Sequence, residues 1–164
     1  MQPFLGLIAD THGLLRPEAL AALAGADLII HAGDVGDPQI LATLAEIAPV
    51  HAIRGNVDKG SWATDLPTTD VVAYQGYLLY VLHDRNDLDL TPEAAGFQAV
   101  ISGHSHQPEI TKRNGVLYVN PGSAGPRRFT LPITVGRLSV TDGHLQAEIV
   151  ELPLTTKGSH ADRQ

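Results

Sequence analysis

The sequence of 164 residues contains no cysteine, and its 11 basic residues are outnumbered by 18 acidic ones. Without cysteine the chain forms neither disulfides nor thiolate metal sites, and its redox compartment is not revealed. The net charge of −7 argues against a protein that coats nucleic acid or binds an anionic membrane, because both roles need a positive surface. A small, locally positive site could still attract an anion.

Long apolar runs are also missing. No stretch approaches the roughly 20 residues of a membrane-spanning helix, and the first residues lack the basic segment and apolar run of a signal peptide. We therefore expect a cytoplasmic protein. Hydrophobic residues make up 43% of the chain, enough for one core, and no repeat or linker divides it. We expect a single domain over residues 1–154 and a flexible C-terminal tail over residues 155–164.

Predicted strands and helices alternate over the first third of the chain. Residues 4–9, 27–31 and 50–54 are short apolar runs typical of buried strands. Between them, residues 17–23 and a segment that begins at Pro38 have apolar side chains at helical spacing. Such alternation favours a parallel sheet with helices packed against it.

Strands and turns dominate the remainder. Two apolar runs, 70–75 and 77–82, are separated only by Gly76. Asn–Gly at 114–115 and Asp–Gly at 142–143, each between apolar runs, are strong signals for β-hairpins. The whole pattern predicts an α/β fold with two packed sheets and helices outside them.

Seven potential metal ligands follow the predicted strands, each group just after a strand ends. Ligands bind beyond the carboxyl ends of parallel strands, so side chains far apart in the sequence can converge at one edge. Seven oxygen and nitrogen donors are about the number that holds two adjacent divalent metals. The candidates are Asp10, His12, Asp34, Asn56, His83, His104 and His106.

The types of donor indicate the chemistry. Asp34 is the natural bridge because a carboxylate has two oxygens, and Asn56 offers a neutral carbonyl oxygen. Mixed oxygen and imidazole donors suit Mn, Fe, Zn or Co better than Ca. Two divalent metals carry more positive charge than two carboxylates neutralise, so the surplus would stabilise a phosphate and lower the pKa of a bridging water. The pattern predicts hydrolysis of a phosphate ester by a metal-bridging hydroxide.

Five short motifs, DTHG, GDVGD, RGNVD, a histidine at a strand end and GHSH, occur in that order. In this order they resemble the calcineurin-like metallophosphoesterase superfamily, and within it the small bacterial phosphodiesterases and the related retromer sorting subunit. The resemblance runs from about Phe4 to Ser123. It implies an α/β fold that is a four-layer α-β-β-α sandwich, two packed mixed sheets with helices outside. It also implies a binuclear hydrolase in which Mn is favoured and Fe, Zn, Ni or Co are alternatives.

The resemblance further implies roles for single residues. Two metal sites would share Asp34. The first would contain Asp10, His12, Asp34 and His106, and the second Asp34, Asn56, His83 and His104. As catalytic and substrate-binding residues, Asn56 and His104 would also contact the phosphoryl oxygens. Apart from the resemblance, Arg127 and Arg128 follow a Pro/Gly-rich stretch and are candidates for a substrate contact, with a solvated loop as the alternative.

Two positions depart from the family pattern. Many members have a histidine where this chain has Val57, and that histidine is thought to protonate the leaving group. Loss of a positioned general acid costs ~10²–10⁴ in rate, so we expect activated aryl phosphodiesters to react better than alkyl monoesters. Asp58 stays as an orienting residue or a weak catalytic acid. The second departure is Asp84 in place of a glycine, which puts a carboxylate near the metals.

A protein-binding scaffold with the same fold is the alternative function, because the retromer subunit shows that the family permits it. The presence of all seven ligands favours the enzyme. A polymeric nucleic acid is a poor substrate hypothesis for a chain of net charge −7, whereas a small phosphate ester, including a small or cyclic nucleotide diester, fits. Exposed edge strands in the C-terminal half suggest a homo-oligomer.

Overall fold

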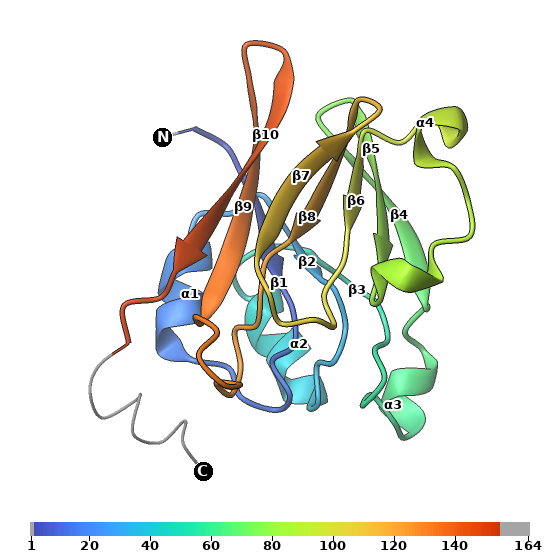
Figure 1. The fold of residues 1–164 in the computed structure, drawn as a ribbon. Coiled ribbons are helices and arrows are strands. Elements are labelled where there is room, and N and C mark those ends of the chain that lie inside the picture. The colour runs from blue at the N-terminus through green and yellow to red at the C-terminus, as the bar shows by residue number, and fades with distance from the viewer. Residues whose placement is uncertain (1, 155–164) are drawn as a thin grey trace.

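A computed structural model describes residues 2–154, and the tail expected over residues 155–164 lies outside the described residues. Within the described part, ten strands form two five-stranded sheets that face each other (Figure 1). The first sheet has the order β10-β9-β1-β2-β3, and the second has the order β4-β5-β6-β8-β7. Both sheets are mixed, as the sequence predicts.

The first sheet combines two parts of the chain. Its parallel half is the expected β-α-β-α-β segment, and its antiparallel half is a C-terminal hairpin that pairs with β1. The strands are β1 (Leu5–Ile8), β2 (Leu28–His31), β3 (Val50–Ala52), β9 (Thr134–Thr141) and β10 (His144–Glu151). All four residues of β1 are buried, which explains why its side chains are apolar or small on both faces.

Two helices, α1 (Pro17–Leu23) and α2 (Pro38–Ala45), connect the parallel strands and cover the outer face of this sheet. Each begins at a proline, which has the backbone angle that a first helical turn requires. Asp37 caps α2, because its side chain accepts a hydrogen bond from the Gln39 N–H at 2.9 Å. The helices predicted from apolar spacing are confirmed.

The second sheet contains both predicted hairpins of the middle region. Its strands are β4 (Thr69–Tyr74), β5 (Tyr77–Leu82), β6 (Ala99–Ile101), β7 (Glu109–Arg113) and β8 (Val116–Asn120). The hairpin turns contain Gln75–Gly76 and Asn114–Gly115, and all four of these residues have positive φ. Strands β5, β6 and β8 run parallel to one another, so their carboxyl ends reach the same end of the sandwich.

The outer face of the second sheet is covered mostly by loop. Two one-turn helices, η1 (Arg85–Asp87) and α4 (Pro92–Ala95), lie in the segment that connects β5 to β6. Phe97 packs on Tyr80 with 5.1 Å between the ring centroids. The sequence did not predict α3 (Ser61–Thr64), a single turn after β3. The α-β-β-α sandwich is therefore present, with a thin helical layer on this side.

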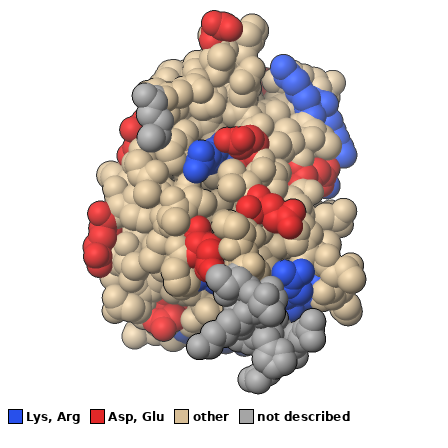
Figure 2. Space-filling model, turned by 90° about the vertical axis from the view of Figure 1, so that its left-hand side faces the viewer, with Lys and Arg blue, Asp and Glu red and all other residues tan. Residues whose placement is uncertain are grey.

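The inner faces of the sheets meet in an apolar core that includes Leu7, Ile30, Leu79, Ile101 and Leu138, all fully buried. The loops after β1, β2, β3, β5 and β6 gather at the end of the sandwich drawn at the bottom of Figure 1. On the face formed by β10 and α1, acidic residues are spread and basic residues form separate patches without a continuous stripe (Figure 2). Among the described residues, no helix is long and apolar enough to cross a membrane.

Candidate metal centre

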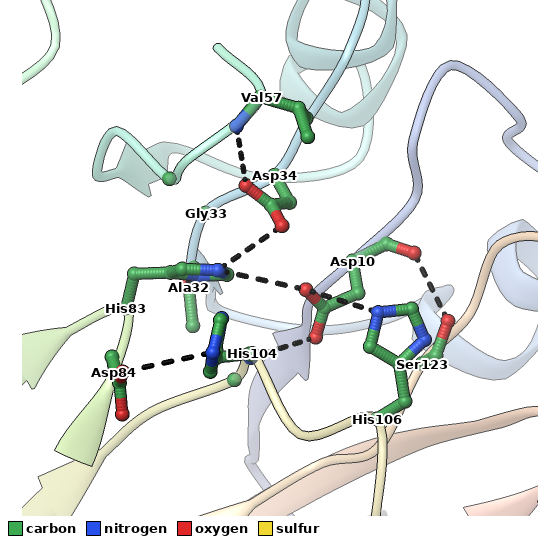
Figure 3. Close-up of polar contacts among 12 residues, drawn as sticks. Asp10, Ala32, Gly33, Asp34, Val57, His83, Asp84, His104, His106 and Ser123 are labelled. Atoms are coloured by element: carbon green, nitrogen blue, oxygen red, sulfur yellow. Dashed lines mark hydrogen bonds and ion pairs between the residues drawn. The ribbon is translucent and has the colours of Figure 1, made fainter. Parts of the chain in front are cut away.

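Four loops carry aspartate and histidine side chains into one cluster (Figure 3). The loop after β1 provides Asp10 and His12, the loop after β2 provides Asp34, His83 follows β5, and His106 follows β6. These residues form two groups in which the ligand atoms lie within 4.8 Å of one another. The first group is Asp10, His12 and His106, and the second is Asp10, Asp34 and His83.

The two carboxylates lie between the imidazoles. Oδ1 of Asp10 is 3.8 Å from Nε2 of His12, 3.8 Å from Nε2 of His83 and 3.7 Å from Nε2 of His106. Oδ2 of Asp34 is 3.4 Å from Nε2 of His12 and 3.1 Å from Nε2 of His83. One oxygen of each aspartate therefore faces imidazoles from separate loops.

Several of these donor atoms are buried without a hydrogen-bond partner among the described residues, namely Oδ1 of Asp10 and Nε2 of His12 and His83. The short contact between His83 and Asp34 lacks hydrogen-bond geometry. Leaving buried polar atoms unpaired is costly, and each such atom needs an explanation. Divalent cations in the two groups would satisfy these atoms, so the residues present fit the metals that the sequence predicts.

One oxygen of Asp34 is engaged by the loop after β3. Its Oδ1 accepts a hydrogen bond from the Val57 N–H at 3.0 Å, so only Oδ2 faces the histidines. A carboxylate oxygen that accepts one hydrogen bond keeps a lone pair, so the expected bridge through both oxygens stays a prediction. The loop after β3 thus fixes the carboxylate in place.

Five of the seven expected ligands have a left-handed backbone. The φ angles of Asp10, His12, Asp34, His104 and His106 are 56°, 47°, 58°, 73° and 64°. Such angles are uncommon outside glycine and persist where the surroundings hold them, often at functional sites. Backbone hydrogen bonds join the first two loops, from the Asp10 N–H to the Gly33 oxygen at 3.0 Å and from the His12 N–H to the Asp34 oxygen at 2.9 Å.

His83 is oriented for metal binding. Its Nδ1 lies 2.7 Å from the carbonyl oxygen of Ala32, which favours the tautomer that donates from Nδ1 and leaves Nε2 as the ligand atom. Gly33 permits this contact, because it has φ 98° and a Cβ there would lie 2.6 Å from Nδ1 of His83. The His83 ring is thus held firmly.

Asp58 supports the loops instead of facing the cluster. Its carboxylate, 4% exposed, accepts backbone hydrogen bonds from Val35 at 3.2 Å, Gly36 at 2.9 Å and Gly55 at 2.8 Å. Both oxygens are therefore occupied by N–H donors. The expectation that Asp58 is a weak catalytic acid is corrected, and the alternative of an orienting residue agrees with these contacts.

A buried chain of hydrogen bonds lies beneath the cluster. Thr11 donates to the Val35 carbonyl at 2.8 Å, and its Oγ1 is 3.0 Å from Nε2 of His31. Nδ1 of His31 accepts from the Gly33 N–H at 3.2 Å. Burial lowers the pKa of His31 to about 4, so this ring is neutral and serves as a support. The sequence offered only a weak signal for it, a histidine inside an apolar strand.

His104 and Asn56 lie at the rim of the cluster. The His104 N–H donates to Oδ2 of Asp10 at 3.0 Å, whereas its imidazole is 42% exposed and lies 3.6 Å from Oδ2 of Asp84. Asn56 is exposed and lines, together with His83, a cavity of about 510 Å³. The structure therefore brings five of the seven expected ligands together and places these two beside them.

The segment NPGS, residues 120–123, braces the site from below. Ser123 donates to the backbone oxygen of Asp10 at 3.0 Å. Asn120 donates to the backbone oxygen of Gly103 at 2.9 Å and to Oγ of Ser105 at 3.1 Å. The segment therefore joins the loops after β1 and β6, which carry ligands of the same group.

The pKa values of the cluster residues show that positive charge only partly balances the buried carboxylates. Burial raises the pKa of Asp10 to about 7. Burial alone would lower the pKa of His83, but its contacts with Asp34 and the Ala32 carbonyl outweigh this effect and raise the pKa to about 9. Burial would raise the pKa of Asp34, but contacts with His83 and Val57 lower it to about 2. A proton on His83 therefore supplies positive charge that a bound cation would replace.

Two further imidazoles of the cluster, those of His12 and His106, have lowered pKa values. Burial lowers the pKa of His106 to about 4, and the positive charge of Arg128 adds to this effect. Burial also lowers the pKa of His12, partly offset by the charge of Asp34. Neutral imidazole is the form that binds metals. The sequence gives only a weak signal for Arg128, a pair of adjacent arginines after a Pro/Gly-rich stretch.

Comparison with known proteins places this geometry in a family. The sequence profile of the calcineurin-like phosphoesterase superfamily domain matches residues 4–143. A probable metallophosphoesterase of Methanothermobacter thermautotrophicus is 33% identical over 158 residues, which cover 89% of this chain and 91% of the relative. A relative this similar over nearly its whole length supports the same family as the profile does.

Solved structures share the fold. Vps29 of Chaetomium thermophilum superposes with a TM-score of 0.78 at 20% identity, covering 94% of this chain and 91% of that one. A structure described as a novel archaeal phosphodiesterase superposes with a TM-score of 0.74 at 21% identity, covering 90% of this chain and 99% of that one. At these identities the likeness concerns the fold alone.

Proposed function

Because the chain belongs to the calcineurin-like phosphoesterase superfamily, we propose that it is a hydrolase with a binuclear metal centre that cleaves phosphodiesters. The position of Asp34 carries the proposal. Its Oδ2 lies 3.4 Å from His12 and 3.1 Å from His83, between two groups of donors that share Asp10. Mn²⁺ is the favoured metal, with Fe, Zn, Ni or Co as alternatives.

The proposed sites follow the two groups of ligand atoms. His12 and His106 would hold one metal and His83 the other, with Asp10 and Asp34 shared between them. Asn56 and His104 would complete the second site from the rim. When bound, two divalent metals act as Lewis acids on phosphoryl oxygens and lower the pKa of a coordinated water to near neutrality.

The chain's own residues position the substrate. Asn56 and His104, both at the rim, would also contact the phosphoryl oxygens of a bound substrate. Asp84, 3.6 Å from Nε2 of His104, orients that ring. Asp58 keeps the loops after β2 and β3 together, so the distance between Asp34 and Asn56 is maintained. Arg127 is proposed as a further substrate contact.

Val57 limits the choice of leaving group. Its side chain is 44% exposed and has no proton to transfer, so the leaving oxygen departs without a side-chain acid at this position. Leaving groups that are stable as anions, such as nitrophenolate, are affected least. We therefore propose a small phosphodiester as the substrate. We also propose that the protein is cytoplasmic and that polymeric nucleic acid is not its substrate. A homo-oligomer stays a prediction.

The direct test is hydrolysis of bis-p-nitrophenyl phosphate with Mn²⁺. We expect turnover by the wild-type protein and its loss in His12→Ala and Asp34→Asn, whereas His144→Ala, on the distal hairpin, serves as the matched histidine control.

A protein-binding scaffold is the second candidate function, and the fold shared with Vps29 favours it. Bound metal without turnover of any phosphoester would support the scaffold over the enzyme.

A further inference from the structure

A small cavity adjoins the metal centre on the side of the first metal group. Its volume is about 220 Å³. We call it the basic cavity, and its lining residues are His12, His106, Pro126, Arg127 and Arg128. Two expected metal ligands thus form one wall and two arginines form the other. An occupant of the basic cavity would lie directly beside the phosphate that the metals hold.

The segment that carries the arginines is fixed to the loop after β1. Both Nη2 and Nε of Arg16 donate to the carbonyl oxygen of Gly125, at 3.0 and 3.3 Å. Gly125 also lies against the backbone of Thr11, where a Cβ would come 2.3 Å from the Thr11 oxygen. The base of this segment therefore cannot move away without disturbing the loop that carries Asp10 and His12.

The tip of the segment is a closed turn. The Leu131 N–H donates to the backbone oxygen of Arg128 at 3.1 Å, and Phe129 between them has φ 56°. A bulky residue in this conformation is uncommon and points to a functional or structural constraint. The turn holds Arg128 next to the cavity, so less freedom is lost when a ligand binds.

The two arginines are not engaged elsewhere. Neither Arg127 nor Arg128 forms an ion pair or a hydrogen bond through its side chain with any residue that the structure describes. The Arg128 charge nevertheless acts on the metal centre. Burial has the largest influence on the pKa values of Asp10, His12 and His106, and Arg128 lowers all three. Two guanidinium groups without a partner among the described residues are therefore available to bind an anion beside the metal centre.

The cavity on the other side has an excess of acidic residues. It has a volume of about 510 Å³, shares Asn56 and His83 with the metal centre, and is lined by three carboxylates, Asp84, Asp87 and Asp89, against a single arginine, Arg54. A second anionic group of a substrate would be repelled there and attracted to the basic cavity. The centre therefore discriminates between its two sides by charge.

Resting on the proposed function, we propose that the substrate carries a second phosphate group, a few bonds from the phosphate that reacts, and that Arg128 with Arg127 binds it in the basic cavity. Guanidinium groups bind phosphate through paired, charge-assisted hydrogen bonds. A volume of about 220 Å³ lies below the range of ~300–1,000 Å³ for whole small-molecule ligands, so it suits one compact group. Arg128 is thus a specificity-determining residue for anionic phosphodiesters.

A matched pair of substrates tests the proposal. Thymidine 5′-(p-nitrophenyl phosphate) and its 3′-phosphorylated form share the same leaving group and differ by one remote phosphate. We expect kcat/KM to be at least about tenfold higher for the 3′-phosphorylated form, mainly because KM is lower. A change of this size corresponds to the gain of at least one charge-assisted hydrogen bond. The ratio should fall to about one in Arg128→Ala and be partly kept in Arg128→Lys. Lys112→Ala, which removes an exposed positive charge on β7, should leave the ratio unchanged.

Binding without turnover separates this inference from the proposed function. Calorimetry should show tighter binding of thymidine 3′,5′-bisphosphate than of thymidine 5′-phosphate, and Arg128→Ala should abolish the difference. If both esters and bis-p-nitrophenyl phosphate resist hydrolysis while this difference persists, the proposed function fails and the phosphate site stands. If the wild-type protein hydrolyses and binds the members of each pair equally well, the inference is overturned and the phosphodiesterase stands.

Discussion

The backbone N–H of Val57 donates a hydrogen bond to Oδ1 of Asp34 at 3.0 Å. The residue that replaces the family histidine therefore still fixes the shared carboxylate, since the contact comes from the backbone and not from the side chain. At position 57 the backbone therefore orients Asp34, whereas only the side chain decides whether a proton can be transferred. The side chain can be changed without removing the hydrogen bond that orients Asp34.

Val57→His should restore a proton donor. We expect kcat for an alkyl phosphodiester to rise by about tenfold or more, toward the ~10²–10⁴ of a positioned general acid, whereas bis-p-nitrophenyl phosphate should gain little. Val57→Ala is the matched control and should improve neither substrate. Equal effects of the histidine on both leaving groups would contradict the role assigned to this position.

Asp58→Asn should loosen the loops. One of the two acceptor oxygens becomes an NH₂ group that faces backbone N–H donors, so we expect the free energy of unfolding to fall by about 2–4 kcal/mol. Urea denaturation of the metal-free protein measures the loss. Asp37→Asn is the control, because asparagine also caps a helix and should change stability by less than about 0.5 kcal/mol. Equal stability of the two variants would remove the role of Asp58 as a tie between loops.

Metal binding should release protons. His83, whose pKa is raised to about 9, holds a proton at pH 7 and must lose it before Nε2 binds a metal. Apparent affinity should therefore rise from pH 7 toward pH 9 and fall below pH 7, where protonation of Asp10, of pKa about 7, competes as well. Titration calorimetry in buffers of different ionisation enthalpy counts the protons, and a count of zero at pH 7 would refute the assignment of His83.

Metal should also protect the fold. A ligand that binds only the native state stabilises it by about 2.7 kcal/mol at 100 times its Kd, so Mn²⁺ should raise the Tm and a chelator should reverse the shift. His83→Ala should lose most of the shift, whereas His51→Ala, a partly exposed histidine on β3, should keep it. Protection of both variants to the same extent would show that the metal binds elsewhere.

Local patterns in the sequence predicted the elements of the fold well. Asn114–Gly115 encodes its hairpin turn directly, because both residues adopt the positive φ that such turns need. Pro38 after Asp37 encodes the start of α2 in the same local way. The single turn of α3 was missed, since four residues are too few for a helical spacing to be visible.

Contacts between distant residues could not be predicted in this way. The order of motifs indicated that Asp34 is shared, but not that Val57 occupies its second oxygen. Likewise, an aspartate in a loop can face a metal or backbone N–H groups. Only the approach of the loops after β2 and β3 shows that Asp58 binds backbone N–H groups. The exposure of the His104 ring and the position of Arg128 depend on loop conformations that no periodicity encodes.

The count and position of bound metals test the central claim most directly. After incubation with Mn²⁺, elemental analysis should give two ions per chain, and anomalous diffraction should place them on either side of Oδ2 of Asp34, about 3.5–4 Å apart. Asp34→Asn should lose at least one ion. Crystals that show no anomalous peak near Asp10 and Asp34, even after soaking with Mn²⁺ or Zn²⁺, would contradict the account.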